Sequence, residues 1–166
     1  MITPDYCRMM ARYNAWQNDG LRKMIGEMDR GVLTEDRGAF WGSIFGTLNH
    51  ALWGDQIWIS RFDGGASTDV PLKESAEFMP TAAVWAAERF RMDARITLWA
   101  ESVPAVDLVG ELAWYSGAMG RDVTKPKPLC VVQMFNHQTH HRGQVHQMLT
   151  SLGLKPNDTD LPFMPE

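Results

Sequence analysis

The sequence predicts an all-α protein built from four long helices, with a small β-hairpin between the third and the fourth. Apolar residues recur at helical spacing in four segments, capping residues stand where these segments begin, and one connection between them is long and rich in turn residues. We expect a single domain spanning residues 1–166, because a chain of this length can bury most of its apolar surface in one core.

The first helix is expected to run from Pro4 to about Asp29. Thr3 is a capping residue, and the proline after it is favoured at the first position of a helix. A glycine-containing loop is expected to follow. The apolar residues that mark this helix recur toward one face, at Met10, Tyr13, Trp16, Leu21 and Met28.

The second helix is expected to start at the capping residue Ser43 and to end at about Phe62. Its apolar residues are spread almost all the way round the helix, which predicts burial on several sides. They include Ile44, Leu48, Leu52, Ile57 and Ile59.

A long connection, "DGGASTDVPLKESAEFMP", separates the second helix from the third, which is expected to start at Thr81 and to stop before Pro104. Such a length suits a crossover that brings the chain back along the molecule. The glycine-rich "FDGGAST" at its start lacks the preceding strand, the following helix and the lysine of a phosphate-binding loop, so we interpret it as a linker.

A hairpin and a fourth helix complete the predicted elements. Leu108, Leu112 and Trp114 alternate with Val109, Glu111 and Ala113 before a turn at Gly117 to Gly120, which is a signal of a β-hairpin. The fourth helix is expected to start near Pro128 and to end at Gly153, a residue suited to the C-terminal cap. The remaining tail contains too many prolines for a helix.

Composition narrows the classes of partner. The chain has 16 basic and 20 acidic residues, a net charge of -4, and no basic stripe of the kind that binds nucleic acid. Cys7 and Cys130 stand alone in predicted helices, which suits a reducing, cytoplasmic setting. No apolar run approaches a secretion signal or the ~20 residues of a membrane span. We therefore expect a cytoplasmic protein with no nucleic-acid partner and no membrane partner.

Four of the five histidines stand within the segment Phe135 to Leu149. At ~100° per residue, the apolar stripe of this helix covers roughly 20° to 120° measured from His137. His141 falls at about 40°, inside the stripe, and His137 at its border, whereas His140 and His146 lie roughly 120° from its centre. The first two are therefore expected to face the core and the other two to face away from it.

The pair His137 and His141 can chelate a metal ion, because Cβ atoms four residues apart on a helix are only ~5–6 Å apart. Zinc and similar ions bind neutral imidazole nitrogens, and catalytic sites typically use three protein ligands and leave one position open. His50 is the one histidine outside this helix, and the small residues Gly46 and Gly54 share its face. We expect metal binding to weaken as the pH falls through ~6.5, because the ligands must be neutral. On the residues alone, simple packing of polar side chains stays open as the alternative.

The neighbours of this pair are expected to have supporting roles. His140 and His146 are interpreted as solvent-facing side chains or as outer contacts of the ligands. Gln144 lies about 60° from His141 on the helical wheel and could orient a ligand or a bound water. Arg142 is expected to form a structural ion pair. Asp55 and Glu111 are available acids, but nothing in the sequence places either near the histidines, and no Ser-His-Asp or Cys-His spacing is present, so no general base is assigned.

Three stretches resemble DinB/YfiT-like proteins over nearly the whole chain: "YNAWQNDGL", "SIFGTLNHALWGDQIWISRF" and "MFNHQTHHRGQVHQMLTSLG". The resemblance implies a four-helix bundle with a crossover between helices two and three, often dimeric. It also implies a divalent-metal site with an open coordination position, whose ligands would be His50, His137 and His141. Relatives include transferases and isomerases that use low-molecular-weight thiols such as bacillithiol or mycothiol.

The leading hypothesis is therefore a metal-dependent enzyme that activates a thiol or water for reaction with a small-molecule substrate, as a transferase or a hydrolase. Zinc and nickel are the expected ions, with iron and manganese as further candidates. A homodimer is expected. One alternative is a bundle that binds a metal or small ligand without catalysis, as a stress-response or sensor module. Another is a structural dimerisation bundle in which the histidines only pack.

Overall fold

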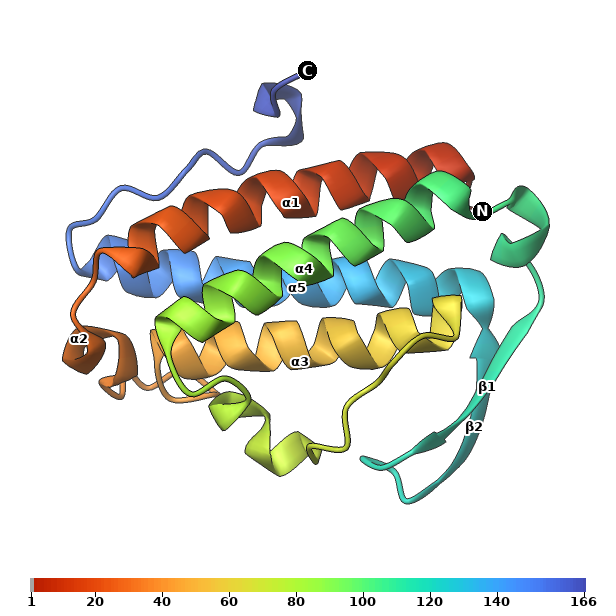
Figure 1. Ribbon diagram of the computed structural model, residues 1–166, viewed down its shortest axis with the longest axis horizontal. Helices are drawn as coiled ribbons and strands as arrows, with labels where there is room; N and C mark the ends of the chain where they lie inside the picture. Colours follow the sequence, from red (N-terminus) through yellow and green to blue (C-terminus); the bar gives the residue numbers. More distant parts are fainter. Residues whose placement is uncertain (1) are drawn as a thin grey trace.

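The computed structural model describes residues 2–166 and is dominated by four long helices that lie side by side (Figure 1). These are α1 (Pro4–Gly26), α3 (Ile44–Asp63), α4 (Ala82–Ser102) and α5 (Lys127–Ser151). Shorter elements join them: helix α2 (Arg30–Thr34), short 3₁₀ helices at Leu72–Glu77, Ala105–Leu108 and Leu161–Phe163, and strands β1 (Glu111–Ser116) and β2 (Arg121–Pro126). No helix in this part of the chain has the length and apolar character that crossing a bilayer requires.

Side chains cap the starts of the first three long helices at the predicted residues. The hydroxyl oxygens of Thr3, Ser43 and Thr81 each accept a hydrogen bond from a backbone amide in the first turn, at 3.2, 3.0 and 3.3 Å. Such bonds satisfy amides that have no partner within the helix. At the other end of the chain, α5 stops just before Gly153, whose φ of 77° is the left-handed conformation expected of a C-terminal cap.

The expected end of the first helix is wrong by one turn. Helix α1 stops at Gly26, and the loop predicted to follow contains the short helix α2 instead. The cause lies in Asp29, whose carboxylate accepts a hydrogen bond of 2.7 Å from the amide of Gly31 and so caps a new helix. Leu33 on this helix is buried, which fixes α2 against the core.

Helices α3 and α4 run in the same direction. Near their starts, the indole nitrogen of Trp85 donates to the carbonyl oxygen of Leu48 at 3.0 Å. Near their ends, Arg95 forms an ion pair of 2.8 Å with Asp63. A connection between two parallel neighbouring helices must run the length of the bundle, from the end of the first helix back to the side where that helix starts. The segment between α3 and α4 does so, with its 3₁₀ helix packed against α3 (Figure 1).

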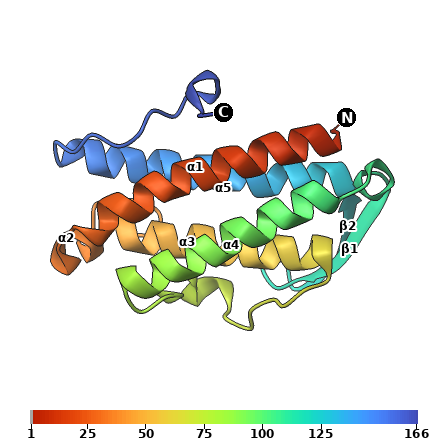
Figure 2. The same ribbon diagram turned by 45° about the horizontal axis from the view of Figure 1, so that its top comes forward.

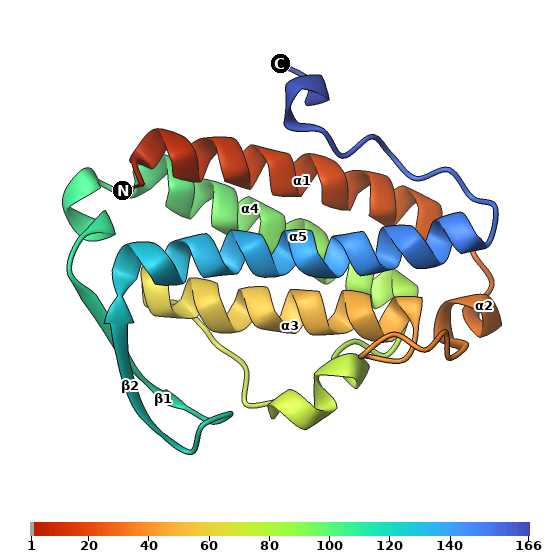
Figure 3. The same cartoon turned by 180° about the vertical axis from the view of Figure 1, so that it is seen from behind.

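The four long helices enclose the core. Helix α1 contacts α4 and α5, and α3 contacts α4 and α5, so that each helix has two long neighbours (Figure 3). Both cysteines are free and buried. The largest fully buried apolar side chains come from every long helix and include Ile25, Ile44, Leu52, Ile59, Trp85, Ile96, Met134, Phe135 and Leu149.

A buried ion network, formed by Asp55, Arg89 and Asp93, lies among the apolar residues. Arg89 on α4 contacts Asp55 on α3 at 2.6 Å and Asp93 on its own helix at 2.8 Å, and Asn18 on α1 donates to Asp93 at 2.9 Å. Burial raises the pKa of Asp55 to about 6, although Arg89 opposes this shift. The network thus joins three helices. Removing Arg89 would leave two carboxylates buried without the cation that contacts them, which strongly destabilises the fold in a low-dielectric interior.

The predicted hairpin is present and is attached to the end of α3. Strands β1 and β2 pair antiparallel, with Trp114 opposite the buried Val123. The guanidinium of Arg61 lies over the rings of Trp58 and Trp114, at 4.7 and 4.9 Å from their centroids. Cation–π contacts of this kind favour one position of the hairpin on the helical body.

Candidate metal site

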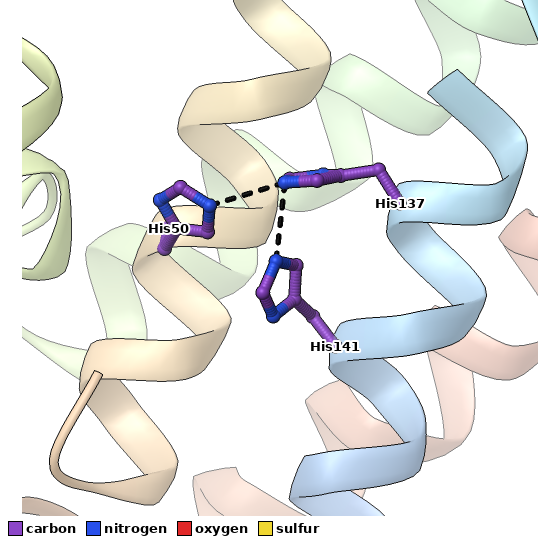
Figure 4. A group of neighbouring side chains, drawn as sticks. All are labelled: His50, His137 and His141. Carbon is purple, nitrogen blue, oxygen red and sulfur yellow. Dashed lines mark hydrogen bonds between the residues drawn. The ribbon is translucent and has the colours of Figure 1, made fainter. Parts of the chain in front are cut away.

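Three histidines converge between α3 and α5 (Figure 4). The Nε2 atom of His137 lies 3.1 Å from the Nε2 atom of His50 and 3.1 Å from the Nε2 atom of His141. One nitrogen from each ring lies within 4.8 Å of the others. The structure thus brings together the three residues that the sequence singled out, although they come from two helices and His50 is almost ninety positions away from the pair.

The local packing explains why the rings can meet. His50 is 5% exposed and His141 is 6% exposed, while His137 is only half-buried, as its place at the border of the apolar stripe predicts. Gly54 on α3 faces the His137 ring, and a Cβ atom at Gly54 would lie 2.5 Å from a carbon of that ring. The glycine therefore provides the space through which His137 reaches the other two histidines.

Two further side chains hold the outer nitrogens of His50 and His141, whereas the buried Nδ1 atom of His137 has no hydrogen-bond partner within residues 2–166. The Nδ1 atom of His141 lies 2.7 Å from the amide oxygen of Gln144, and the Nδ1 atom of His50 lies 2.9 Å from the hydroxyl of Ser75, which is fully buried. An amide oxygen can only accept, so His141 carries its proton on Nδ1 and presents the lone pair of Nε2 to the centre. Outer partners of this type orient the rings of metal-binding histidines.

The three rings are neutral near pH 7. Burial, followed by the charges of neighbouring histidines, lowers the pKa of His50 to about 3 and that of His137 to about 3. Burial also lowers the pKa of His141, although its hydrogen bond with Gln144 opposes the shift. Neutral imidazoles are the form in which histidine binds metal ions.

The donor set fits a divalent cation. Nitrogens bound at ~2.0–2.1 Å to a tetrahedral ion are roughly 3.3–3.4 Å apart, close to the two observed separations. A single proton on the Nε2 atom of His137 could satisfy only one of its two contacts, because His50 and His141 both direct a ring nitrogen at it. One cation bound between the rings would contact all three nitrogens, which lie within 4.8 Å of one another.

Two indole rings stack with His50. The ring of Trp41 has its centroid 3.9 Å from that of the imidazole with planes 20° apart, and the ring of Trp53 lies at 5.7 Å and 22°. Trp41 belongs to the loop before α3, which the sequence did not connect with the site. Together the indoles restrict the ring of His50 to one plane and shield it from water.

The remaining candidates do not join the cluster. His140 is exposed and meets only the edge of His141, with ring centroids 4.9 Å apart. His146 faces α1, on another side of α5. Asp55 belongs to the buried ion network, and Glu111 is exposed on β1, so neither acid lies among the grouped histidines.

The ion pair expected for Arg142 is absent from the described residues. Arg142 instead donates to the amide oxygen of Gln138 at 3.0 Å, and its guanidinium lies 5.3 Å from the ring centroid of Tyr13. The nearby carboxylates of the buried ion network are already in contact with Arg89. Arg142 is therefore left as a buried cation without a carboxylate in contact.

Replacing Gln144 by alanine is expected to weaken metal binding by ~10–100-fold without abolishing it, because only the outer partner of His141 is lost. Competition titration with a chromogenic chelator measures the change. Gln147→Ala is the control, since Gln147 is an exposed glutamine on the same helix whose amide bonds only to Ser151. Equal effects of the two changes would show that Gln144 does not support the site.

Comparison with known proteins identifies the family of the chain. The model of the DinB family matches residues 1–166 of the chain. Protein DinB of Bacillus subtilis (strain 168) is 25% identical over 163 residues, which cover 94% of this chain and 91% of that protein. On the strength of the match along its whole length, the chain belongs to the DinB family.

Proposed function

We propose that His50, His137 and His141 bind one divalent metal ion, and that the protein is a metal-dependent enzyme acting on a small molecule. The observation that carries the proposal is the convergence of three Nε2 atoms, together with the orientation of the His50 ring by Ser75 and of the His141 ring by Gln144. In this proposal the scaffold is a single-domain four-helix bundle with its crossover between α3 and α4.

A bound ion would supply Lewis-acid chemistry, which lowers the pKa of a thiol or a water molecule and makes it a nucleophile at neutral pH. Three protein ligands leave a coordination position for that nucleophile. The contribution of the chain is to hold three neutral imidazoles in place and to stack Trp41 and Trp53 against His50. Zinc and nickel are the proposed ions, and iron and manganese the further candidates.

Binding without catalysis is the second candidate, and one observation favours it. Among residues 2–166, the group of potential metal ligands consists of three histidines and includes no carboxylate that would serve as a general base. If the protein is an enzyme, the same observation bears on the reaction. A thiol can react without a general base once its pKa is lowered, so transfer to a low-molecular-weight thiol is favoured over hydrolysis.

An activity assay separates these candidates. The metal-loaded protein is incubated with cysteine or other small thiols and 1-chloro-2,4-dinitrobenzene, and separately with p-nitrophenyl acetate. Enzymatic function predicts turnover that is lost in the metal-free protein and in His141→Ala. Full metal loading without turnover on either class of substrate would favour the binding role.

The metal content is expected to be ~1 ion per chain and to persist below pH ~6.5. The sequence alone suggested weakening near the ordinary imidazole pKa of ~6.5. Because burial lowers the pKa of His50 and of His137 to about 3, protons compete for these nitrogens only at lower pH. Elemental analysis after dialysis across a pH series measures this, and loss of half the metal at pH ~6.5 would contradict it.

We also propose that the protein is a cytoplasmic homodimer. The outer face of α4 exposes Phe90 and Leu98, which line an open groove of about 670 Å³, and exposed apolar side chains of this size favour contact with another protein surface. Light scattering during size-exclusion chromatography tests the assembly, and a monomer at micromolar concentration would overturn it.

A further inference from the structure

A cavity lies on the opposite side of α5 from the histidine cluster. It has a volume of about 420 Å³, with α1 and α5 as walls and the C-terminal tail as roof. Figure 2 and Figure 3 show the tail running back from the end of α5 along α1. The volume is in the range of sites for small organic molecules.

Arg142 supplies the positive charge of this cavity. It lines the cavity while being only 7% exposed, and no carboxylate in residues 2–166 lies at ion-pair distance from it. Its hydrogen bonds in this part of the chain go to Gln138 and Thr139, which leaves other N–H groups of its five free. Arg89, by contrast, contacts two carboxylates, so Arg142 is a buried guanidinium with unused donors.

The rest of the lining is complementary to an anion with an apolar body. None of the described lining residues is acidic, and His146 adds a second nitrogen donor on α5, one turn after Arg142. Leu21 and Met24 on α1, and Pro156 on the tail, supply apolar surface. We propose that this cavity binds a small organic carboxylate, which Arg142 contacts through two parallel N–H donors.

The roof is attached to α1 through the backbone of the tail. Tyr13 donates to the carbonyl oxygen of Thr159 at 2.7 Å, and Gln17 donates to that of Asp158 at 2.7 Å. Tyr13 also lies against the guanidinium of Arg142. Tyr13 thus positions both the C-terminal tail and the guanidinium of Arg142, which holds the tail over the cavity between α1 and α5.

The test uses the full-length, metal-loaded protein and four probes. Benzoate and hexanoate are titrated by NMR beside their neutral amides, benzamide and hexanamide, while the backbone amides of Thr139, Gly143 and Gln147 are observed. Each carboxylate is expected to bind at least ~10-fold more tightly than its amide, because a charge-assisted bidentate contact is lost in the amide. Equal binding of acid and amide would overturn the proposal.

A variant that fills the cavity distinguishes carboxylate binding in the cavity from carboxylate binding at the metal ion. Gly143 lines the cavity, and a Cβ atom there meets nothing within 4 Å, so Gly143→Leu adds a side chain without a clash at its base. Leucine is also a better helix former than glycine, so the variant should fold. Carboxylate binding is expected to fall at least ~10-fold with unchanged metal content.

The matched control is Gly26→Leu, another helical glycine whose Cβ atom would meet open space, but outside the cavity lining. It is expected to bind like the wild type. Unchanged benzoate binding in Gly143→Leu would place the ligand elsewhere. An absence of shifts in the wild type at ~10 mM probe, tenfold above a dissociation constant of ~1 mM, would also overturn the proposal.

Discussion

Replacement of His141 or His137 by alanine is expected to abolish tight metal binding, and His50→Ala is expected to do the same. Each change removes one of three converging nitrogens, and no other described side chain lies in a position to replace it. Isothermal titration calorimetry with zinc measures the loss. Since the third ligand comes from a different helix, the His50 variant also tests whether α3 and α5 pack as described.

The other two histidines of α5 provide the control. His140→Ala removes an exposed ring that meets only the edge of His141, and His146→Ala changes the cavity on the α1 side. Both variants are expected to bind zinc largely as the wild type does. If His140→Ala loses the metal as completely as His141→Ala, or if His50→Ala keeps it, the assignment of the three ligands is wrong.

Replacing Arg89 by methionine is expected to lower the free energy of unfolding by ~3–5 kcal/mol, because two buried carboxylates lose the cation that contacts both. Methionine has a similar length, so loss of packing is a minor part of the effect. Chemical denaturation followed by circular dichroism measures the change. Arg91→Met, two residues along the same helix, breaks only an exposed ion pair with Glu88 and should cost ~0–1 kcal/mol.

The stability deficit of Arg89→Met, that is, its loss in free energy of unfolding relative to the wild type, should also depend on pH. Burial raises the pKa of Asp55 and of Asp93, and removal of the opposing guanidinium raises both further. A carboxyl group whose folded pKa is above its unfolded pKa of ~3.9 destabilises the fold when ionised, and protonation relieves this as the pH falls. The deficit should therefore be smaller at pH 5 than at pH 8, and a pH-independent deficit would contradict the buried ion network.

Much of the fold can be read from local signals. Thr3, Ser43 and Thr81 act on amides within their own first turns, so the helix starts depend on few residues and were predicted correctly. The end of α1 was not predicted correctly, because a polar residue such as Asp29 can stand in the last turn of one helix or cap the start of the next. The burial of Leu33, a tertiary effect, favours the second.

In the candidate site, too, the features set by local sequence signals were predicted, and the features set by tertiary contacts were not. Helical periodicity placed His141 in the core and His137 at its edge, and the spacing of the pair predicted their convergence. Ser75 and Trp41 could not be found in this way, because each belongs to a segment without periodicity and reaches His50 only through the folded chain. That Arg142 has no ion pair within residues 2–166 depends likewise on tertiary contacts, because Asp55 on α3 contacts Arg89 on α4 instead.

The most direct test of the metal site is a crystal structure of protein loaded with zinc, with anomalous scattering recorded on both sides of the zinc absorption edge. We predict one anomalous peak per chain, placed between the Nε2 atoms of His50, His137 and His141 and disappearing below the edge. A crystal that shows no such peak, or a peak bound by other residues while these three rings keep only their mutual contacts, would contradict the proposed metal site.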